Sequence, residues 1–377
     1  MPPPNADDTP ASVRYNARPY LHGPETAAIA AAMEAGQYGH GPQADLFESE
    51  LAAYLGVPDV VAVSSATTGI HLALMACGVA PGDEVIVPSQ TFAATIQPIV
   101  ALGAFPRFID HHPDTLCIEP EAVREAITPA TRAVLPVLYG GRPVDLGSIA
   151  PELEHRGIHV VEDAAQAFGP RRVTGRATTV YSFGPIKQLT ALVGGAIVPR
   201  TTDQANALRR MRALGITSSQ TQRIQTTTYT VDGPGLRGVL PDVNAAVGRV
   251  QLARFDTVAA RRAALWKAYA HALHGTPDVS LVDVGVVGDG TVPFNCVVRV
   301  PDRDRVHRTM RERGIGVGVH YPPNHLQPAF ARWTRPLPVT ERVAGEILSL
   351  PFHPAMTPDD SRWTATALLE ALTATTA

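Results

Sequence analysis

The sequence predicts an α/β fold: a mainly parallel sheet covered by helices on both faces, followed by a smaller C-terminal α+β lobe. From residue 60 to residue 200, short β-branched runs alternate with helical patterns, which is typical of a parallel sheet. The runs EVIVP and HVVE are apolar without alternation, as expected for strands buried on both faces. At 377 residues the chain exceeds the ~250 to 300 residues that one core usually serves, so two lobes are expected.

The first lobe contains the predicted strands, separated by predicted helices. The strand segments, in order, are VVAVSS, DEVIVPS, FPRFID, RAVLPVLYG, IHVVEDAA, TTVYSF and GGAIVPR. Apolar periodicity predicts helices in the segments TTGIHLALMACGV, TFAATIQPIVALG, EPEAVREAIT and DLGSIAPELEHRG. Strands and helices alternating in this way form a doubly covered sheet.

The pattern changes after residue 214. Residues 215–242 are polar and glycine-bearing, which predicts a long functional loop, and residues 243–273 predict one long helix. A smaller lobe follows, with strands expected in TVPFNCVVRV and GVGVHYP and helices in RDRVHRTMRERG and SRWTATALLEALTA. We therefore expect an N-terminal arm (1–30), a large domain (31–245) and a small C-terminal domain (246–377).

Composition excludes several classes of function. A net charge of −3 gives no electrostatic footprint for nucleic acid, and no run of ~20 apolar residues predicts a membrane span. The three cysteines are widely spaced, and the first residues lack a signal-peptide pattern, so we expect a cytoplasmic protein with a flexible start. His111 and His112 are expected in a surface turn.

Lysine usage singles out one position. Of the 32 lysine and arginine residues, only Lys187 and Lys267 are lysines. Lys187 lies in the apolar segment YSFGPIKQL, where a desolvated amine could form a Schiff base, which a guanidinium cannot. The alternative is a lysine whose apolar stem covers a strand end.

Further polar and aromatic candidates lie where predicted strands end, the edge at which open parallel sheets bind ligands. Asp163 and Gln166 follow one strand, Ser182 ends another, and Phe92 follows a third. Ser64, Ser65, Ala66 and Thr67 join a strand to a helix, where free N–H groups could hold phosphate. Each is open to an ordinary structural reading as a helix cap or core residue. Together they describe a pyridoxal phosphate site, with a lysine for the aldehyde and an aspartate for the ring nitrogen.

The chain resembles the DegT/DnrJ/EryC1/StrS family of pyridoxal-phosphate-dependent sugar aminotransferases. The resemblance covers nearly the whole length and is carried by blocks in the family's order, among them VAVSSATTGIHLALMACG, PSQTFAAT, VVEDAAQAFG, YSFGPIKQL and HYPPNHLQPAF. It implies fold type I, with a mainly parallel seven-stranded sheet sandwiched by helices. It also implies a homodimer whose active site lies at the subunit interface.

By position, the resemblance implies that Lys187 is the catalytic residue that holds the cofactor as an imine and then moves a proton. Asp163 would bind the pyridine nitrogen, Gln166 would approach the phenolic oxygen, and Phe92 would stack on the ring. Ser182, Ala66 and Thr67 would hold the phosphate. His320, Tyr321 and His325 lie at the family's substrate mouth, and the histidine pair is expected to shape the pocket without binding metal.

Four departures from the family surround this site. Ala66 replaces a glycine, the segment before TTVYSF is short and reads Gly175 and Arg176, and Val193 replaces a glutamate. The family's G-Y-N-Y-R loop aligns with GLRGV, which puts Arg237 at the asparagine and Val239 at the arginine. Arg237 either makes a charged phosphate contact across the dimer interface or lies on a solvated loop.

The function expected from these features is transfer of an amino group from glutamate or glutamine to a keto sugar, nucleotide-linked or not, or a keto cyclitol in specialised metabolism. Because the departures surround the catalytic face, a second hypothesis keeps the cofactor and changes the reaction to elimination, decarboxylation or condensation. A third is a non-catalytic regulator that binds the cofactor. No nucleic-acid or membrane partner is expected.

Overall fold

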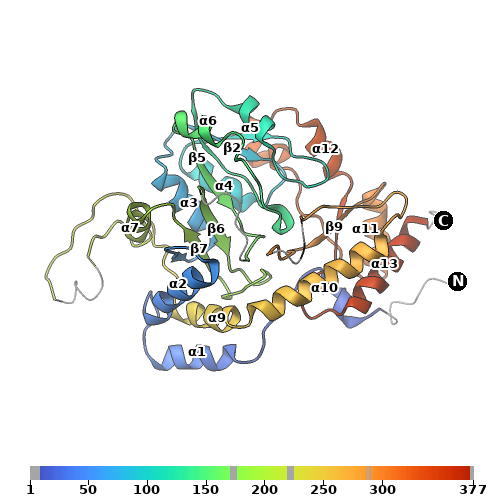
Figure 1. Ribbon diagram of the computed structural model, residues 1–377, viewed down its shortest axis with the longest axis horizontal. Coiled ribbons are helices and arrows are strands. Elements are labelled where there is room, and N and C mark those ends of the chain that lie inside the picture. The colour runs from blue at the N-terminus through green and yellow to red at the C-terminus, as the bar shows by residue number, and fades with distance from the viewer. Residues whose placement is uncertain (1–8, 170–175, 219–224, 286, 288–289, 374–377) are drawn as a thin grey trace.

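The computed structural model describes residues 9–169, 176–218, 225–285, 287 and 290–373 (Figure 1). The flexible start was expected over residues 1–16, of which residues 1–8 lie outside the described ranges, as does the departure at Gly175. Within the described ranges, every helix is too short or too polar to span a lipid bilayer.

A seven-stranded sheet forms the centre of the large lobe, in the order β1-β7-β6-β5-β4-β2-β3. Its strands pair in parallel except β7, which is antiparallel to both β1 and β6. Each strand lies inside a predicted segment except β4, which begins one residue before its segment, so the predicted α/β class and sheet are confirmed. The strands are β1 (Val61–Val63), β2 (Glu84–Pro88), β3 (Phe105–Ile109), β4 (Thr131–Val134), β5 (His159–Asp163), β6 (Thr178–Ser182) and β7 (Gly195–Val198).

Helices cover both faces of the sheet with separate apolar cores. One face packs against α3 (Ala66–Ala76), α4 (Ala93–Ala101) and α7 (Thr202–Met211), through residues such as Leu72, Ile96 and Leu208. The other face packs against α2 (Pro42–Leu55), α5 (Pro120–Ala126), α6 (Ala150–His155) and α9 (Asp242–Leu252). Burial on both faces explains the continuous apolar strands seen in the sequence.

Side chains from neighbouring elements cover the open edge of β1. Glu48 of α2 accepts a hydrogen bond of 2.8 Å from the Ala62 backbone N–H. Arg212, which follows α7, donates one of 2.6 Å to the Ala62 carbonyl and forms a close ion pair with Glu48. Beyond them, the Ser64 N–H donates to the Gly238 carbonyl at 2.8 Å. The buried backbone groups of this edge strand are therefore satisfied without another strand.

The predicted helix over 243–273 is two helices, α9 and α10 (Phe255–Leu273), separated at Ala253 and Arg254. The sequence has no breaker there, and packing explains the interruption: α9 contacts α2 and α1 (Glu25–Glu34), whereas α10 contacts α13 (Pro358–Thr373). Figure 1 shows α9 and α10 running from the large lobe to the small one. The expected boundary at residue 246 falls within α9, and we propose the interruption as the boundary.

The small lobe contains a three-stranded sheet in the order β10-β9-β8. Its strands are β8 (Ser280–Leu281), β9 (Cys296–Arg299) and β10 (Ile347–Leu350). Its other elements are α11 (Arg303–Glu312), α12 (Pro338–Ala344) and the 3-10 helices Asn324–Leu326 and Pro328–Trp333. The predicted strand over 316–322 was wrong, because only Gly318 forms a bridge there, with Ser349.

The N-terminal arm packs against the beginning of this segment. Gly316 donates its N–H to the Val13 carbonyl at 2.8 Å, and a Cβ on Gly316 would lie 2.5 Å from the Asn16 nitrogen. Val13, in the 3-10 helix Ala11–Arg14, is fully buried in the small-lobe core. The described part of the arm is therefore packed against the small lobe, so the expectation of a flexible start was wrong for residues 9–16.

Candidate active site

Most of the predicted cofactor-binding residues lie at the carboxyl ends of neighbouring strands. Asp163 and Ser182 are the last residues of β5 and β6, which pair in parallel, and β1 leads through Ser64 and Ser65 into α3. Phe92 is the residue immediately before α4, and it follows the end of β2 by four positions. The strand order thus gathers residues from four separate stretches of sequence at one edge of the sheet.

Asp163 is a buried carboxylate held by two hydrogen bonds. The Thr95 hydroxyl donates to its Oδ2 at 2.7 Å, and the Ala165 N–H donates to its Oδ1 at 3.0 Å. Burial raises the pKa of Asp163, whereas these hydrogen bonds and the positive charge of Lys187 oppose the rise. Because its pKa is raised overall, the carboxylate depends on these hydrogen bonds and on a nearby cation to carry negative charge.

Lys187 lies in the turn after β6, where its N–H donates to the Gly184 carbonyl at 3.1 Å. Its Nζ lies 4.5 Å from the centre of the Phe294 ring. Burial lowers the pKa of Lys187 to about 8, although the carboxylate of Asp163 works in the opposite direction. An amine with this pKa has a neutral, nucleophilic fraction close to physiological pH.

Gln166 connects the two lobes at this edge. Its Oε1 accepts from the Gly140 N–H at 2.7 Å, and its Nε2 donates to the Tyr321 hydroxyl at 3.2 Å. The Phe92 ring centre lies 5.5 Å from that of Tyr321, and Phe92 is 60% exposed despite its apolar ring. Phe92 is thus available to a flat ligand and is not a core residue.

The turn into α3 can receive a phosphate. Ser65 caps the helix by accepting from the Thr68 N–H, and the first helical residues, Ala66 and Thr67, have N–H groups without intrahelical acceptors. A Cβ on Gly195 would lie 2.7 Å from the Ala66 nitrogen, so only glycine lets β7 approach this turn. Ser182, paired with Gly195 in the sheet, is partly exposed beside it. This phosphate turn, the buried acid and the amine together fit pyridoxal phosphate.

The four departures have different surroundings. Val193 is exposed, and Arg176 forms an ion pair with Glu154 at 3.3 Å, both partners more than half exposed. Arg237 is exposed and has no side-chain hydrogen bond or ion pair within the described ranges. Its backbone bridges to Ala213, and the next residue, Gly238, bonds to the phosphate turn of the same chain through Ser64.

The three predicted substrate residues separate into two groups. Tyr321 contacts Phe92 and Gln166, while His320 Nδ1 lies 2.8 Å from the Ser349 hydroxyl and its carbonyl accepts from Tyr139. Burial raises the pKa of Tyr321 to about 12, so its phenol stays protonated. These two residues belong to the edge that carries Lys187.

His325 is fully enclosed. Its Nδ1 lies 2.6 Å from the Ser89 hydroxyl, and its Nε2 lies 3.3 Å from Glu341. With both ring nitrogens occupied and no exposed surface, the geometry favours a role in fixing the chain between Ser89 and Phe92 over the predicted substrate contact.

Three residues that sequence reasoning missed complete the site. Phe294 lies beside the Lys187 amine, Thr95 bonds to Asp163, and Asn324 donates to the carbonyls of Ser89 and Thr91, at 2.9 and 2.6 Å. Thr95 follows Phe92 by three positions, so helical spacing placed both on one side of α4. Phe294 and Asn324 are distant in sequence and gave no local signal.

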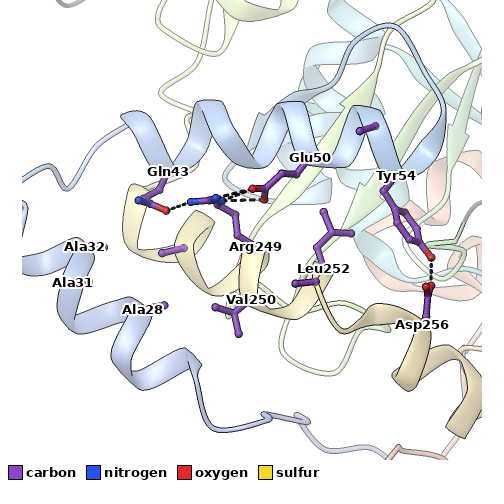
Figure 2. Close-up of a pocket in the computed structure, with 13 residues that line it drawn as sticks. Ala28, Ala31, Ala32, Gln43, Glu50, Tyr54, Arg249, Val250, Leu252 and Asp256 are labelled. Carbon is purple, nitrogen blue, oxygen red and sulfur yellow. Dashed lines mark hydrogen bonds and ion pairs between the residues drawn. The ribbon is translucent and has the colours of Figure 1, made fainter.

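A cavity of about 780 Å³ opens elsewhere, between α1, α2 and α9 (Figure 2). Its polar side chains pair with one another: Arg249 bonds to Glu50 and Gln43, and Tyr54 donates to Asp256 at 3.0 Å. Alanines form much of the remaining wall. The lining does not include Lys187 or Asp163, so this cavity is separate from the candidate site. Within the described residues, no group of three or more His, Cys, Asp or Glu could hold a metal ion.

Comparison with known proteins identifies the family. The sequence model of the DegT/DnrJ/EryC1/StrS aminotransferase family matches residues 19–368. The chain belongs to this family. DesV of S. venezuelae, solved in complex with a ketimine intermediate, is 36% identical over 94% of this chain and 96% of that chain, with a TM-score of 0.86.

Two further solved structures are similar to this chain. DesI, solved in the presence of its TDP-sugar product, is 29% identical over 98% of this chain and 95% of its own, with a TM-score of 0.85. NtdA of Bacillus subtilis, solved with bound cofactor PMP, is 26% identical over 94% of this chain and 83% of its own, also with a TM-score of 0.85. The protein is accordingly a pyridoxal-phosphate-dependent aminotransferase with the predicted fold type I architecture.

Proposed function

We propose that the protein moves an amino group from glutamate or glutamine to a keto sugar, nucleotide-linked or free, or to a keto cyclitol, in the biosynthesis of an amino sugar or antibiotic. The observation that carries this proposal is the half-buried Lys187 amine near the buried Asp163 carboxylate, at the edge where the phosphate turn begins. DesI, which was solved with a TDP-sugar product, supports a sugar acceptor.

In this proposal each side chain has one task. When bound, pyridoxal phosphate supplies an electrophilic aldehyde carbon and an electron-withdrawing ring. Lys187 would hold the cofactor through its amine, and when free that amine would carry a proton between the substrate carbon and the C4′ carbon of the cofactor. The Asp163 carboxylate would hold a proton on the ring nitrogen, and Phe92 would stack on the ring.

The remaining residues orient and exclude water. The N–H groups of Ala66 and Thr67, with the Ser182 hydroxyl, hold the phosphate. Gln166 is fixed by Gly140 and Tyr321, so its amide would approach the phenolic oxygen of the cofactor with little further loss of side-chain entropy. Tyr321, as a protonated phenol, donates to an oxygen of the acceptor beside His320.

The test is a half-reaction with the donor alone. Purified holoprotein mixed with glutamate or glutamine should lose the absorbance of the lysine-bound cofactor and release the corresponding keto acid in equal amount. Addition of a keto sugar nucleotide should then restore the absorbance and yield the amino sugar. If no donor converts the cofactor while other substrates are eliminated or decarboxylated, the proposal is wrong.

We further propose a cytoplasmic homodimer in which Arg237 reaches the partner's phosphate. Figure 1 shows the segment after α7 leaving the body of the molecule, and Tyr229, Val231 and Arg237 on its described parts are exposed. Exposed aromatic and arginine side chains are common at interfaces.

Mixing two inactive variants tests this arrangement. Lys187→Ala and Arg237→Ala chains, unfolded and refolded together, should recover about a quarter of wild-type activity, because a hybrid dimer has one complete site. No recovery, or unchanged cofactor affinity in Arg237→Ala alone, would contradict the contact across the interface.

A further inference from the structure

Arg262 is a buried cation without an anionic partner. It lies in α10, is 2% exposed, and forms no ion pair within the described ranges. Its NH1 donates to the Phe294 carbonyl at 3.0 Å and reaches the Pro293 carbonyl at 3.5 Å, while its Nε has no hydrogen-bond partner among the residues that the structure describes. The Phe352 ring, 5.6 Å from its Cζ, forms another side of its surroundings. A buried charge left without a counter-ion destabilises a fold, so its presence needs an explanation.

Phe294 connects this cation to the active site. The backbone carbonyl of Phe294 accepts from Arg262, and the ring of the same residue lies 4.5 Å from Lys187 Nζ. The Phe294 N–H is also fixed, by a hydrogen bond of 2.9 Å to the Gly140 carbonyl. The carbonyl and the N–H of Phe294 are thus both hydrogen-bonded, so Phe294 is fixed in place between the Arg262 guanidinium and the Lys187 amine.

We propose that Arg262 is a positioning residue for Lys187: it fixes the Phe294 ring against the amine, and its unpaired charge disfavours the ammonium form of Lys187. The inference rests on the proposed role of Lys187 as the cofactor-binding amine. Arg262 would thereby support the reaction, because the neutral form of the Lys187 amine is the one that bonds to a carbonyl and accepts a proton.

The charges around Lys187 act in opposite directions. Asp163, from β5, favours the ammonium, whereas Arg262, from α10, disfavours it and supports the effect of burial on the pKa of Lys187. Burial lowers the pKa of the His320 imidazole, with a further contribution from the charge of Lys187, and Tyr321 remains a neutral phenol. Burial lowers the pKa of Arg262 to about 9, which leaves it charged at neutral pH. Removing Arg262 therefore leaves Asp163 as the nearest charge acting on the amine.

The scarcity of lysine makes the amine directly measurable. Lys187 and Lys267 are the lysines of this chain, and Lys267 is exposed on the same helix as Arg262. Trace acetylation of the full chain, freed of cofactor, at a series of pH values and read by peptide mass spectrometry gives a separate midpoint for each lysine. This measurement needs neither cofactor nor substrate, so a protein that fails to transaminate still reports the Lys187 midpoint.

We expect the Lys187 midpoint to rise by about one pH unit in Arg262→Met and Arg262→Gln, since each loses the positive charge. The neutral fraction at pH 7 then falls about tenfold, while the Lys267 midpoint stays unchanged. Arg261→Met is the matched control: Arg261 is the adjacent residue but is exposed, so its loss should leave the Lys187 midpoint in place. Phe294→Leu keeps the cation and removes the ring, which stabilises ammonium, so the midpoint should fall.

Thermal melting checks that each variant is folded. An unchanged Lys187 midpoint in a folded Arg262→Met or Arg262→Gln protein overturns the inference. If neither variant folds, Phe294→Leu provides the test, and a Lys187 midpoint equal to that of the wild type overturns the positioning role.

Discussion

The hydroxyl of Thr95 donates a hydrogen bond of 2.7 Å to the Asp163 carboxylate inside the buried edge of the sheet. The same hydroxyl lies 2.8 Å from that of Thr91, so two threonines form a short chain of hydroxyl groups leading to the acid. Both threonines are buried, and water has little access to replace either contact. The charge of Asp163 therefore depends on a residue of α4 as well as on its own strand.

We expect Thr95→Val to weaken cofactor binding by about 10- to 100-fold, because a hydrogen bond to a charged group contributes ~1.5 to 3 kcal/mol. Equilibrium dialysis against pyridoxal phosphate measures the affinity. Thr95→Ser, which keeps the hydroxyl, should stay within a few-fold of wild type. Equal losses in the valine and serine variants would assign the effect to packing.

The two lysines provide a matched pair of substitutions. Lys187→Arg keeps a positive charge but cannot form an imine, so the transamination rate should fall by at least ~1,000-fold. Lys267→Arg makes the same chemical change at an exposed position of α10 and should leave the rate unchanged. Borohydride reduction followed by peptide mapping should find the cofactor mass on the Lys187 peptide of the Lys267→Arg protein. Cofactor attached elsewhere would remove Lys187 from its proposed role.

The ion pair between Glu48 and Arg212 should be important for stability. Replacing Arg212 with leucine removes one of the two arginines paired with the buried Glu48 and leaves the Ala62 carbonyl unpaired, so the free energy of unfolding should fall by about 1.5 to 3 kcal/mol. Urea unfolding followed by circular dichroism gives this value. The exposed pair of Arg362 and Asp359 is the control, and Arg362→Ala should cost less than about 1 kcal/mol. Similar losses at both sites would argue against the covering role of Arg212.

Acidification should destabilise the fold. Burial lowers the pKa of His111, and also of His71 and His159, below the ordinary value of 6.5 that each regains on unfolding. The unfolded chain therefore binds more protons, so this stability is complete above pH 6.5 and is lost as the pH falls below it. Each such histidine adds a slope of up to about 1.4 kcal/mol per pH unit to the free energy of unfolding.

Urea midpoints between pH 7.5 and 5.5 test this slope. His111→Asn should flatten it, whereas His274→Asn, at an exposed histidine, should not. A slope unaffected by His111→Asn would show that other groups control acid stability.

The sequence was sufficient for the sheet because its signals are local. The runs around Val85 and Val161 are apolar without alternation, and turn residues separate them, so each strand could be predicted without knowing its neighbours. Lys187 was predictable for a different reason: in a chain that uses arginine almost throughout, a lysine in an apolar segment is unusual.

Features that depend on tertiary packing could not be predicted in this way. His111 was expected in a surface turn, but it is buried with its Nε2 2.6 Å from Gln90. The interruption before Phe255 has no breaker residue, and it exists because α9 and α10 pack on different lobes. Phe294 reaches Lys187 across the same lobe boundary. Contacts between segments a hundred residues apart leave no periodicity in the sequence.

The covered edge of β1 also determines how molecules of this protein meet one another. With the N–H and carbonyl of Ala62 taken by side chains and the Ser64 N–H taken by Gly238, a strand from a second molecule finds no free ladder to extend. At the β1 edge, a second molecule can then bind only through side-chain contacts, and this edge is protected from adding a strand of another copy. Gly238, beside the phosphate turn, and the buried ion pair of Glu48 and Arg212 thus also prevent this edge from pairing with another molecule.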